Sequence, residues 1–84
     1  MSITVWSKPN CVQCKAVYRA FDRVPGLTYE VKNLPDFPEK LAEFIEAGFT
    51  AAPVVEATGH KTFAGFNPDA VKAIAFEYGP ATVA

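Results

Sequence analysis

The sequence is poor in cysteine. It has two among 84 residues, far below the roughly 8–10% of a small secreted domain held together by disulfides, so such a scaffold is excluded. It also lacks any apolar run near the roughly 18 to 20 residues that cross a bilayer, and its start lacks the basic and apolar segments of a signal peptide. We therefore expect a cytoplasmic protein that does not enter membranes. There, the spacing Cys11-x-x-Cys14 indicates redox chemistry or metal binding.

The sequence also has no large excess of positive or of negative charge. The net charge is −1, which argues against a nucleic-acid-binding protein. The distribution is nevertheless uneven, because residues 1–23 contain four basic residues and one acidic residue, a surplus of three positive charges. The cysteine pair lies in this basic segment. Two interpretations stay open: a solvated helix face, or support for a thiolate together with attraction of an acidic partner.

Apolar residues, by contrast, are plentiful, at 50% of the chain. A chain of this length has room for one domain, and it needs an efficient core because small domains bury a modest share of their surface. We expect a single domain over residues 1–79 and a frayed tail over residues 80–84.

The cysteines fall where a strand is predicted to give way to a helix. Residues 3–6 form a β-prone run that ends at the Lys-Pro-Asn breaker of residues 8–10, with Asn10 as the candidate N-cap of a helix starting near Cys11. Four apolar residues of this helix share one face: Cys14, Val17, Tyr18 and Phe21. Cys14 is therefore predicted to be buried, whereas Cys11 lies one turn earlier and can be exposed.

A second strand and a second helix are predicted next. Apolar residues alternate with polar ones between residues 27 and 31, which favours an edge strand with one face more buried. The helix is expected to begin at a capping-box-like pair, Asp36 and Glu39, and to end at Gly48. Its apolar face would consist of Phe37, Leu41, Phe44 and Ile45.

The last part of the chain predicts a hairpin and a third helix. Residues 52–55 and 61–64 flank a Thr-Gly turn, and Asn67 is the predicted N-cap of a helix that ends at residues 79–80. The apolar face of that helix would consist of Val71, Ile74, Ala75 and Tyr78. The element order is thus β-α-β-α-β-β-α, an α/β chain with a parallel start, an antiparallel hairpin and helices on both faces of the sheet.

Cys11 and Cys14 are spaced for a reversible disulfide. Residues i and i+3 on a first helical turn lie about 5 to 6 Å apart, within the roughly 4.4 to 6.8 Å that a disulfide allows. At a helix N-terminus, backbone N–H groups and the helix dipole lower thiol pKa values from about 8.5 to about 3.5–7.5. Cys11 is therefore predicted to attack a substrate disulfide, and Cys14 to resolve the mixed disulfide. Lys8 and Lys15 either add positive potential or are ordinary surface lysines.

Two other interpretations of the pair remain. A zinc or iron–sulfur site needs about four ligands, and the chain offers one further soft donor, His60, so two chains would have to share the metal. We expect no metal. Alternatively the cysteines are inert core residues, which suits Cys14 but explains Cys11 at a breaker-to-helix junction poorly.

Pro53 also allows two interpretations. As the first residue of a strand it costs no hydrogen bond. As the second residue of a cis peptide bond it would present the backbone of Ala52 beside the cysteines, where an extended partner segment could pair with it. Phe63 and Phe66 either belong to the core or border an apolar patch.

Three segments resemble the NrdH-redoxins, thioredoxin-fold proteins that are glutaredoxin-like in sequence and thioredoxin-like in behaviour. These are residues 3–14 with their Lys-Pro-x-Cys-Val-Gln-Cys frame, the Ala-Pro-Val-Val of residues 52–55 and the Gly-Phe-Asn-Pro-Asp of residues 65–69. The resemblance covers nearly the whole chain. It implies a thioredoxin/glutaredoxin-like fold with a four-stranded mixed sheet flanked by three helices, and a cis proline at Pro53.

The resemblance also implies a function. The Cys11–Cys14 dithiol would be reduced by NADPH-dependent thioredoxin reductase rather than by glutathione, and would supply electrons to the large subunit of class Ib ribonucleotide reductase for deoxyribonucleotide synthesis. A monomer without a bound cofactor is expected. Beside the two catalytic cysteines, the expected partner-binding residues are Lys8, Val12, Gln13, Ala52, Pro53, Phe63 and Phe66.

The sequence departs from this family at three positions. Phe63 and Asn67 replace the usual Trp and Arg, so the hydrogen bonds of those side chains are absent, and Trp6 stands where Tyr is more usual. One alternative function is a glutathione-dependent glutaredoxin, although the Cys-Pro-Tyr-Cys and Thr-Val-Pro patterns are missing. The other, of a different class, is a non-catalytic module that binds a metal or cluster.

Overall fold

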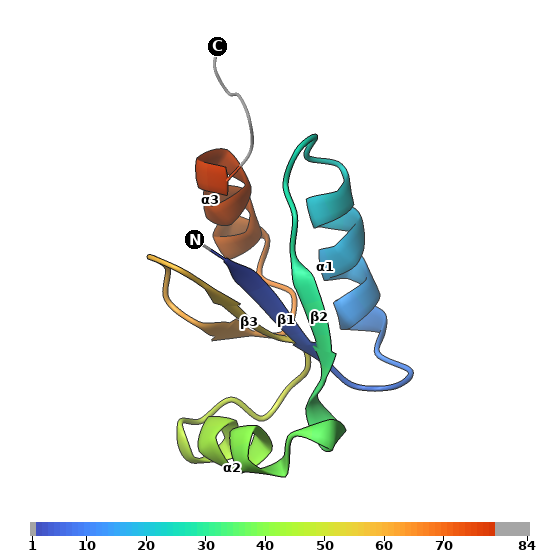
Figure 1. The fold of residues 1–84 in the computed structure, drawn as a ribbon, viewed down its shortest axis with the longest axis vertical. Helices are drawn as coiled ribbons and strands as arrows, with labels where there is room; N and C mark the ends of the chain where they lie inside the picture. The colour runs from blue at the N-terminus through green and yellow to red at the C-terminus, as the bar shows by residue number, and fades with distance from the viewer. Residues whose placement is uncertain (1, 79–84) are drawn as a thin grey trace.

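The structure, a computed structural model, describes residues 2–78 (Figure 1). Its regular elements are β1 Ile3–Ser7, α1 Val12–Asp22, β2 Glu30–Asn33, α2 Pro38–Glu46, β3 Val54–Ala57, β4 Phe63–Ala64 and α3 Pro68–Tyr78. The predicted order β-α-β-α-β-β-α is confirmed, with one addition, a short 3-10 turn over Leu34–Asp36 before α2. No helix within residues 2–78 is both long and apolar enough to cross a membrane.

The four strands form one mixed sheet in the order β2-β1-β3-β4. β1 pairs with β2 in parallel and with β3 antiparallel, and β3 pairs antiparallel with β4. The predicted edge position of the second strand is therefore confirmed, but the strand starts at Glu30 rather than at residue 27. The reason is that β1 begins at Ile3, so residues 27–28 have no strand beside them. Val31, on the face that was predicted to be the more buried one, is 50% exposed at this edge.

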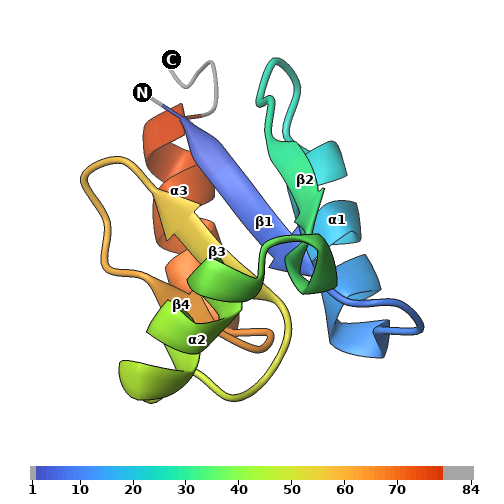
Figure 2. The same ribbon diagram turned by 60° about the horizontal axis from the view of Figure 1, so that its bottom comes forward.

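Helices cover both faces of the sheet, as predicted: α1 and α3 pack on one face and α2 on the other (Figure 2). Side chains alternate along β1, so Val5 lies in the core below α1 and α3, and Trp6 lies in a second core below α2. The buried side chains that α1 and α3 contribute to the first core are Val17, Phe21, Val71 and Ile74.

Two of the predicted helix caps are wrong. Asn10 does not cap α1, because it adopts a left-handed conformation with φ 57° and serves as a turn residue, while Cys11 is the N-cap. Asp36 does not cap α2 either, because it lies inside the 3-10 turn, and α2 has no side-chain cap. The predicted cap of α3 is confirmed, since Asn67 Oδ1 accepts a hydrogen bond of 3.2 Å from the N–H of Ala70.

The end of α2 follows the predicted glycine signal. Gly48 has φ 95°, and its N–H donates to the carbonyl of Ile45, while the N–H of Phe49 donates to the carbonyl of Phe44. These two bonds form a Schellman motif, and the rings of Phe44 and Phe49 pack edge to face over it. Ile45 and Phe37, assigned to the buried face, are 53% and 40% exposed, so that face is narrower than predicted. The expected helix end at residues 79–80 and the tail lie outside the described residues.

Candidate active site at the start of α1

Cys11 and Cys14 are joined by a disulfide, with their Cα atoms 5.2 Å apart. Cys14 is on the buried face of α1 and is 1% exposed, whereas Cys11 is half-buried at the N-cap. The helix runs without interruption from Val12 while this bond is closed. The pair therefore joins a sulfur near the surface to one inside the protein, and the two positions differ as their helical spacing predicted.

The sulfur of Cys11 receives a backbone hydrogen bond. The N–H of Cys14 points at Cys11 Sγ at 3.0 Å, so the sulfur occupies the place of an ordinary capping oxygen. Negative charge on this atom would be stabilised by that N–H and by the positive end of the helix dipole. Lys8 and Lys15 are both exposed, and neither makes an ion pair with an acid among residues 2–78.

Packing on both sides fixes the loop that carries Cys11. Ser7, the last residue of β1, is buried, and its hydroxyl hydrogen-bonds to the hydroxyl of Tyr18 on α1. This contact joins the strand before the loop to the helix after it. Strand β1 and helix α1 together therefore hold the loop that carries Cys11, and such support keeps a reactive group in its working geometry.

The Ala52–Pro53 peptide bond is cis. Pro53 is buried and directly precedes β3, whose first residue, Val54, pairs with Trp6 near the end of β1. The carbonyl of Pro53 accepts a hydrogen bond of 2.8 Å from the N–H of Gly65. Among residues 2–78, Ala52 makes no backbone–backbone hydrogen bond beyond those within the helices and strands. The structure thus shows the cis peptide and places Pro53 directly before a strand, while pairing of Ala52 with a partner segment stays a prediction.

Gln13 ties the cysteine turn to the loop after β4. Its Oε1 atom accepts a hydrogen bond of 2.8 Å from the backbone N–H of Phe66. Gly65, just before, has φ 76°, and a Cβ atom there would lie 2.9 Å from the same Oε1. Sequence reasoning selected Gln13 for its place between the cysteines and missed this internal bond, which joins residues 53 positions apart.

The remaining predicted contact residues separate into exposed and buried ones. Val12, beside Cys11, is 77% exposed, and Phe66 is 40% exposed. Phe63 is 8% exposed and belongs to the core under α1 and α3, so it does not lie at the surface with Phe66. Within residues 2–78, no three His, Cys, Asp or Glu side chains are grouped so that they could hold a metal ion.

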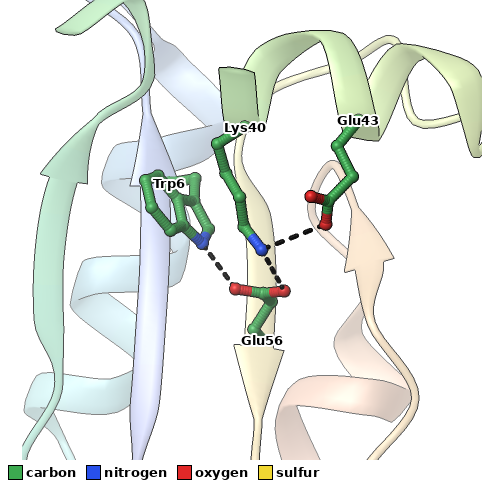
Figure 3. Close-up of polar contacts among 4 residues, drawn as sticks. All are labelled: Trp6, Lys40, Glu43 and Glu56. Carbon is green, nitrogen blue, oxygen red and sulfur yellow. Dashed lines mark hydrogen bonds and ion pairs between the residues drawn. The ribbon is translucent and has the colours of Figure 1, made fainter. Parts of the chain in front are cut away.

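A second polar cluster lies on the α2 face of the sheet (Figure 3). The indole N–H of Trp6 donates to Glu56 at 2.8 Å, and Lys40 bridges Glu56 and Glu43 at 3.4 and 3.2 Å. Burial acts to lower the pKa of Lys40, but its hydrogen bond to Glu43 and the charge of Glu56 outweigh this and raise it. The cluster fastens α2 to β3. The sequence signal that could have indicated this cluster was an acidic residue, Glu56, within the otherwise apolar strand β3.

Comparison with known proteins agrees with the fold and with the cysteine pair. The family model described as Glutaredoxin matches residues 3–61. The glutaredoxin-like protein NrdH of Salmonella typhimurium is 38% identical over 71 residues, which are 84% of this chain and 85% of that protein. Its Lactococcus lactis counterpart is 36% identical over 73 residues, 87% of this chain and 99% of that protein.

A solved structure is similar over nearly the full length. The glutaredoxin-like NrdH-redoxin of Escherichia coli, described as having a thioredoxin-like activity profile, superimposes with a TM-score of 0.81 at 34% sequence identity. The match covers 98% of this chain and 100% of that one. The chain therefore belongs to the glutaredoxin family of thiol–disulfide oxidoreductases, and within it to the NrdH-type glutaredoxin-like proteins, with Cys11 and Cys14 as its redox pair.

Proposed function

We propose that the protein is a dithiol electron carrier in which Cys11 is the nucleophile and Cys14 the resolving thiol. The observation that carries this proposal is the unequal setting of the two sulfurs. Cys11 Sγ is half-buried and accepts the N–H of Cys14 at the positive end of α1, whereas Cys14 is 1% exposed. The first sulfur can meet a partner and carry negative charge, and the second can reach only the first.

The reaction then proceeds in two exchanges. The Cys11 thiolate attacks one sulfur of a partner disulfide, which forms a mixed disulfide and releases the other partner sulfur as a thiolate that takes up a proton. Cys14 loses its proton and attacks Cys11 Sγ, which releases the second partner thiol and closes the Cys11–Cys14 disulfide. Two electrons have passed to the partner, and a reductase must restore the dithiol.

Partner docking is proposed to use the cis-proline segment. Ala52 is half-buried and precedes Pro53, and its backbone has no bond to another backbone group of residues 2–78 outside regular structure. An extended partner segment could therefore pair with Ala52 and place its cysteine at Cys11. Val12 and Phe66, both exposed, would contact that segment from either side.

The electron source is proposed to be NADPH acting through thioredoxin reductase, and the client to be the large subunit of class Ib ribonucleotide reductase. The support is the similarity to NrdH proteins, one of which is described as having a thioredoxin-like activity profile. With these partners the protein would work in the cytoplasm as a monomeric shuttle. A glutathione-dependent glutaredoxin is the second candidate, and the Glutaredoxin family match favours it.

Coupled assays run in parallel test both candidates. One contains NADPH and thioredoxin reductase, and the other contains NADPH, glutathione reductase and glutathione, with the same disulfide substrate in each. We expect NADPH consumption in the first assay and loss of that activity in Cys11→Ser. Cys14→Ser is expected to accumulate a mixed disulfide detectable by mass spectrometry. Turnover with glutathione alone would favour the second candidate, and full activity of Cys11→Ser would contradict the proposed nucleophile.

A further inference from the structure

Helix α1 exposes two parallel rows of side chains that both start at the cysteine turn. Residues four apart lie on the same face of a helix, and this spacing aligns the exposed basic residues Lys15, Arg19 and Arg23. The neighbouring row, shifted by one position, is apolar and consists of Val12, Ala16 and Ala20. The outer surface of α1 is therefore a basic ridge beside an apolar strip.

Part of this surface is hollowed. A depression of about 210 Å³ is lined by Ala16, Arg19, Ala20, Arg23 and Phe66. We call it the Arg19–Arg23 hollow. The two alanines form an apolar floor, and Phe66, 40% exposed, forms a wall whose backbone is held in place by Gln13. The hollow thus connects an aromatic side chain, whose backbone is bonded to the cysteine turn, with two guanidinium groups farther along α1.

Within residues 2–78, neither Arg19 nor Arg23 makes an ion pair with an acid. Asp22, the one acid of α1, instead accepts a hydrogen bond of 2.8 Å from the hydroxyl of Tyr29. The helix dipole favours a positive charge in the last turn of a helix, and this alone explains why a basic residue stands at Arg19. It does not account for two guanidinium groups on successive turns beside one hollow, neither of which is paired with an acid in the described part of the chain.

We propose that the Arg19–Arg23 hollow binds an acidic segment of a redox partner, with an apolar side chain of that segment against Phe66. Carboxylates suit this place because each guanidinium offers a planar pair of donors that match a carboxylate. The assignment to a redox partner rests on the proposed function, whereas the binding of an acidic segment rests on the hollow alone.

The geometry of α1 predicts how far from its cysteine the partner segment should carry its acidic residues. At a rise of about 1.5 Å per residue, Arg19 and Arg23 lie about 12 and 18 Å along α1 from Cys11. An extended segment spans about 3.3 Å per residue. A partner whose cysteine sits at Cys11 would therefore place its carboxylates about four to six residues from that cysteine.

A peptide titration tests the proposal without any redox step. The probe is a peptide with serine in place of the partner cysteine, followed at positions four to six by Glu-Leu-Glu, so that both glutamates lie on one side of the extended segment; its control has Gln-Leu-Gln. Binding is followed by nuclear magnetic resonance of the labelled protein, which gives both the affinity and the amides affected. We expect the acidic peptide to bind about three- to tenfold more tightly at low salt, the worth of one or two exposed ion pairs.

Matched variants locate the effect. In Arg19→Glu/Arg23→Glu the preference for the acidic peptide should disappear, whereas Lys61→Glu/Lys72→Glu, which changes the same charge at exposed lysines outside the hollow, should keep it. Equal binding of the two peptides, or the same preference in both double variants, would overturn the proposal. If the peptides bind as expected but the coupled assays show no turnover, the proposal of an acidic-segment site is supported and the proposed electron-carrier function is contradicted.

Discussion

The side-chain oxygen of Gln13 accepts a hydrogen bond from the backbone N–H of Phe66, so a residue between the two cysteines holds the loop after β4. The next bond in the series runs from the N–H of Gly65 to the carbonyl of Pro53. The Gln13 side chain therefore joins the cysteine turn to the loop, and a backbone hydrogen bond joins the loop to the cis-proline segment.

Replacement of Gln13 should separate the effect of its hydrogen bond from the effect of a charge introduced at position 13. Gln13→Glu keeps an acceptor for Phe66 but places a negative charge two residues from Cys11, which disfavours the thiolate. Gln13→Met removes the acceptor without adding charge. We expect the reduced Glu variant to react with iodoacetamide at pH 7 about three- to tenfold more slowly than the wild type, from roughly 0.7 to 1.4 kcal/mol of charge repulsion.

The Met variant is the control for that experiment. Its alkylation rate should stay within about twofold of the wild type, while its unfolding free energy falls by about 0.5–1.5 kcal/mol through the lost hydrogen bond. Equal rates for the Glu variant and the wild type would show that position 13 does not influence Cys11.

Gly65 and Gly59 offer a matched pair for the close contact with Gln13. Both have positive φ, 76° and 84°, but a Cβ at Gly59 meets open space, whereas one at Gly65 would press on Gln13 Oε1 at 2.9 Å. Alanine at either position pays about 1–2 kcal/mol for the left-handed backbone. We expect Gly65→Ala to lose more stability in urea unfolding than Gly59→Ala.

Removal of the contacting side chain completes that comparison. In a Gln13→Ala background, the excess cost of Gly65→Ala over Gly59→Ala should shrink. An excess that persists there would mean that a different neighbour opposes the added methyl group.

The cluster of Trp6, Lys40 and Glu56 should contribute to stability but not to redox chemistry, since it lies on the α2 face of the sheet (Figure 3). Glu56→Gln keeps an acceptor for the indole N–H and removes the ion pair with Lys40, so we expect a loss below about 1 kcal/mol. Glu56→Ala leaves the indole N–H without its partner and should cost about 1–3 kcal/mol in urea unfolding. Reduced turnover of the Gln variant in the coupled assay would show that α2 influences the cysteines.

Tyr29 should make stability fall at high pH. Burial, followed by the hydrogen bond to Asp22, raises the pKa of Tyr29 from 10.0 to about 12. The unfolded chain therefore releases this proton first as the pH rises, which favours unfolding. The stabilisation is fully present below pH 10 and is lost as the pH approaches 12.

Urea unfolding at several pH values checks this expectation. The stability advantage of the wild type over Tyr29→Phe should shrink between pH 10 and pH 12. Other groups that titrate in this range, Lys40 included, are shared by the two proteins and cancel in the difference. An advantage that stays constant or grows over that range would contradict the assigned shift.

The sequence predicted those features that depend on residues near one another in the chain. The burial of Cys14 follows from helical spacing, and the cap at Asn67 follows from the residues just after it. The hydrogen bonds between Phe66 and Gln13 and between Trp6 and Glu56 join residues 53 and 50 positions apart, so the sequence near each residue does not identify its partner. Asn10 was predicted as the cap because asparagine is a favoured N-cap residue and cysteine is not. Only the backbone angles show that Asn10 forms the turn and that Cys11 caps the helix.

The capping role of Cys11 has a consequence for competition between partners. Because α1 is intact from Val12 with the disulfide closed, closing that bond requires no unwinding of the helix. We therefore expect the oxidised protein to present nearly the same outer surface as the reduced one, including the basic ridge and Phe66. A client that recognises this surface would be occupied by oxidised molecules as readily as by reduced ones. Delivery would then depend on how quickly the reductase keeps the pool reduced.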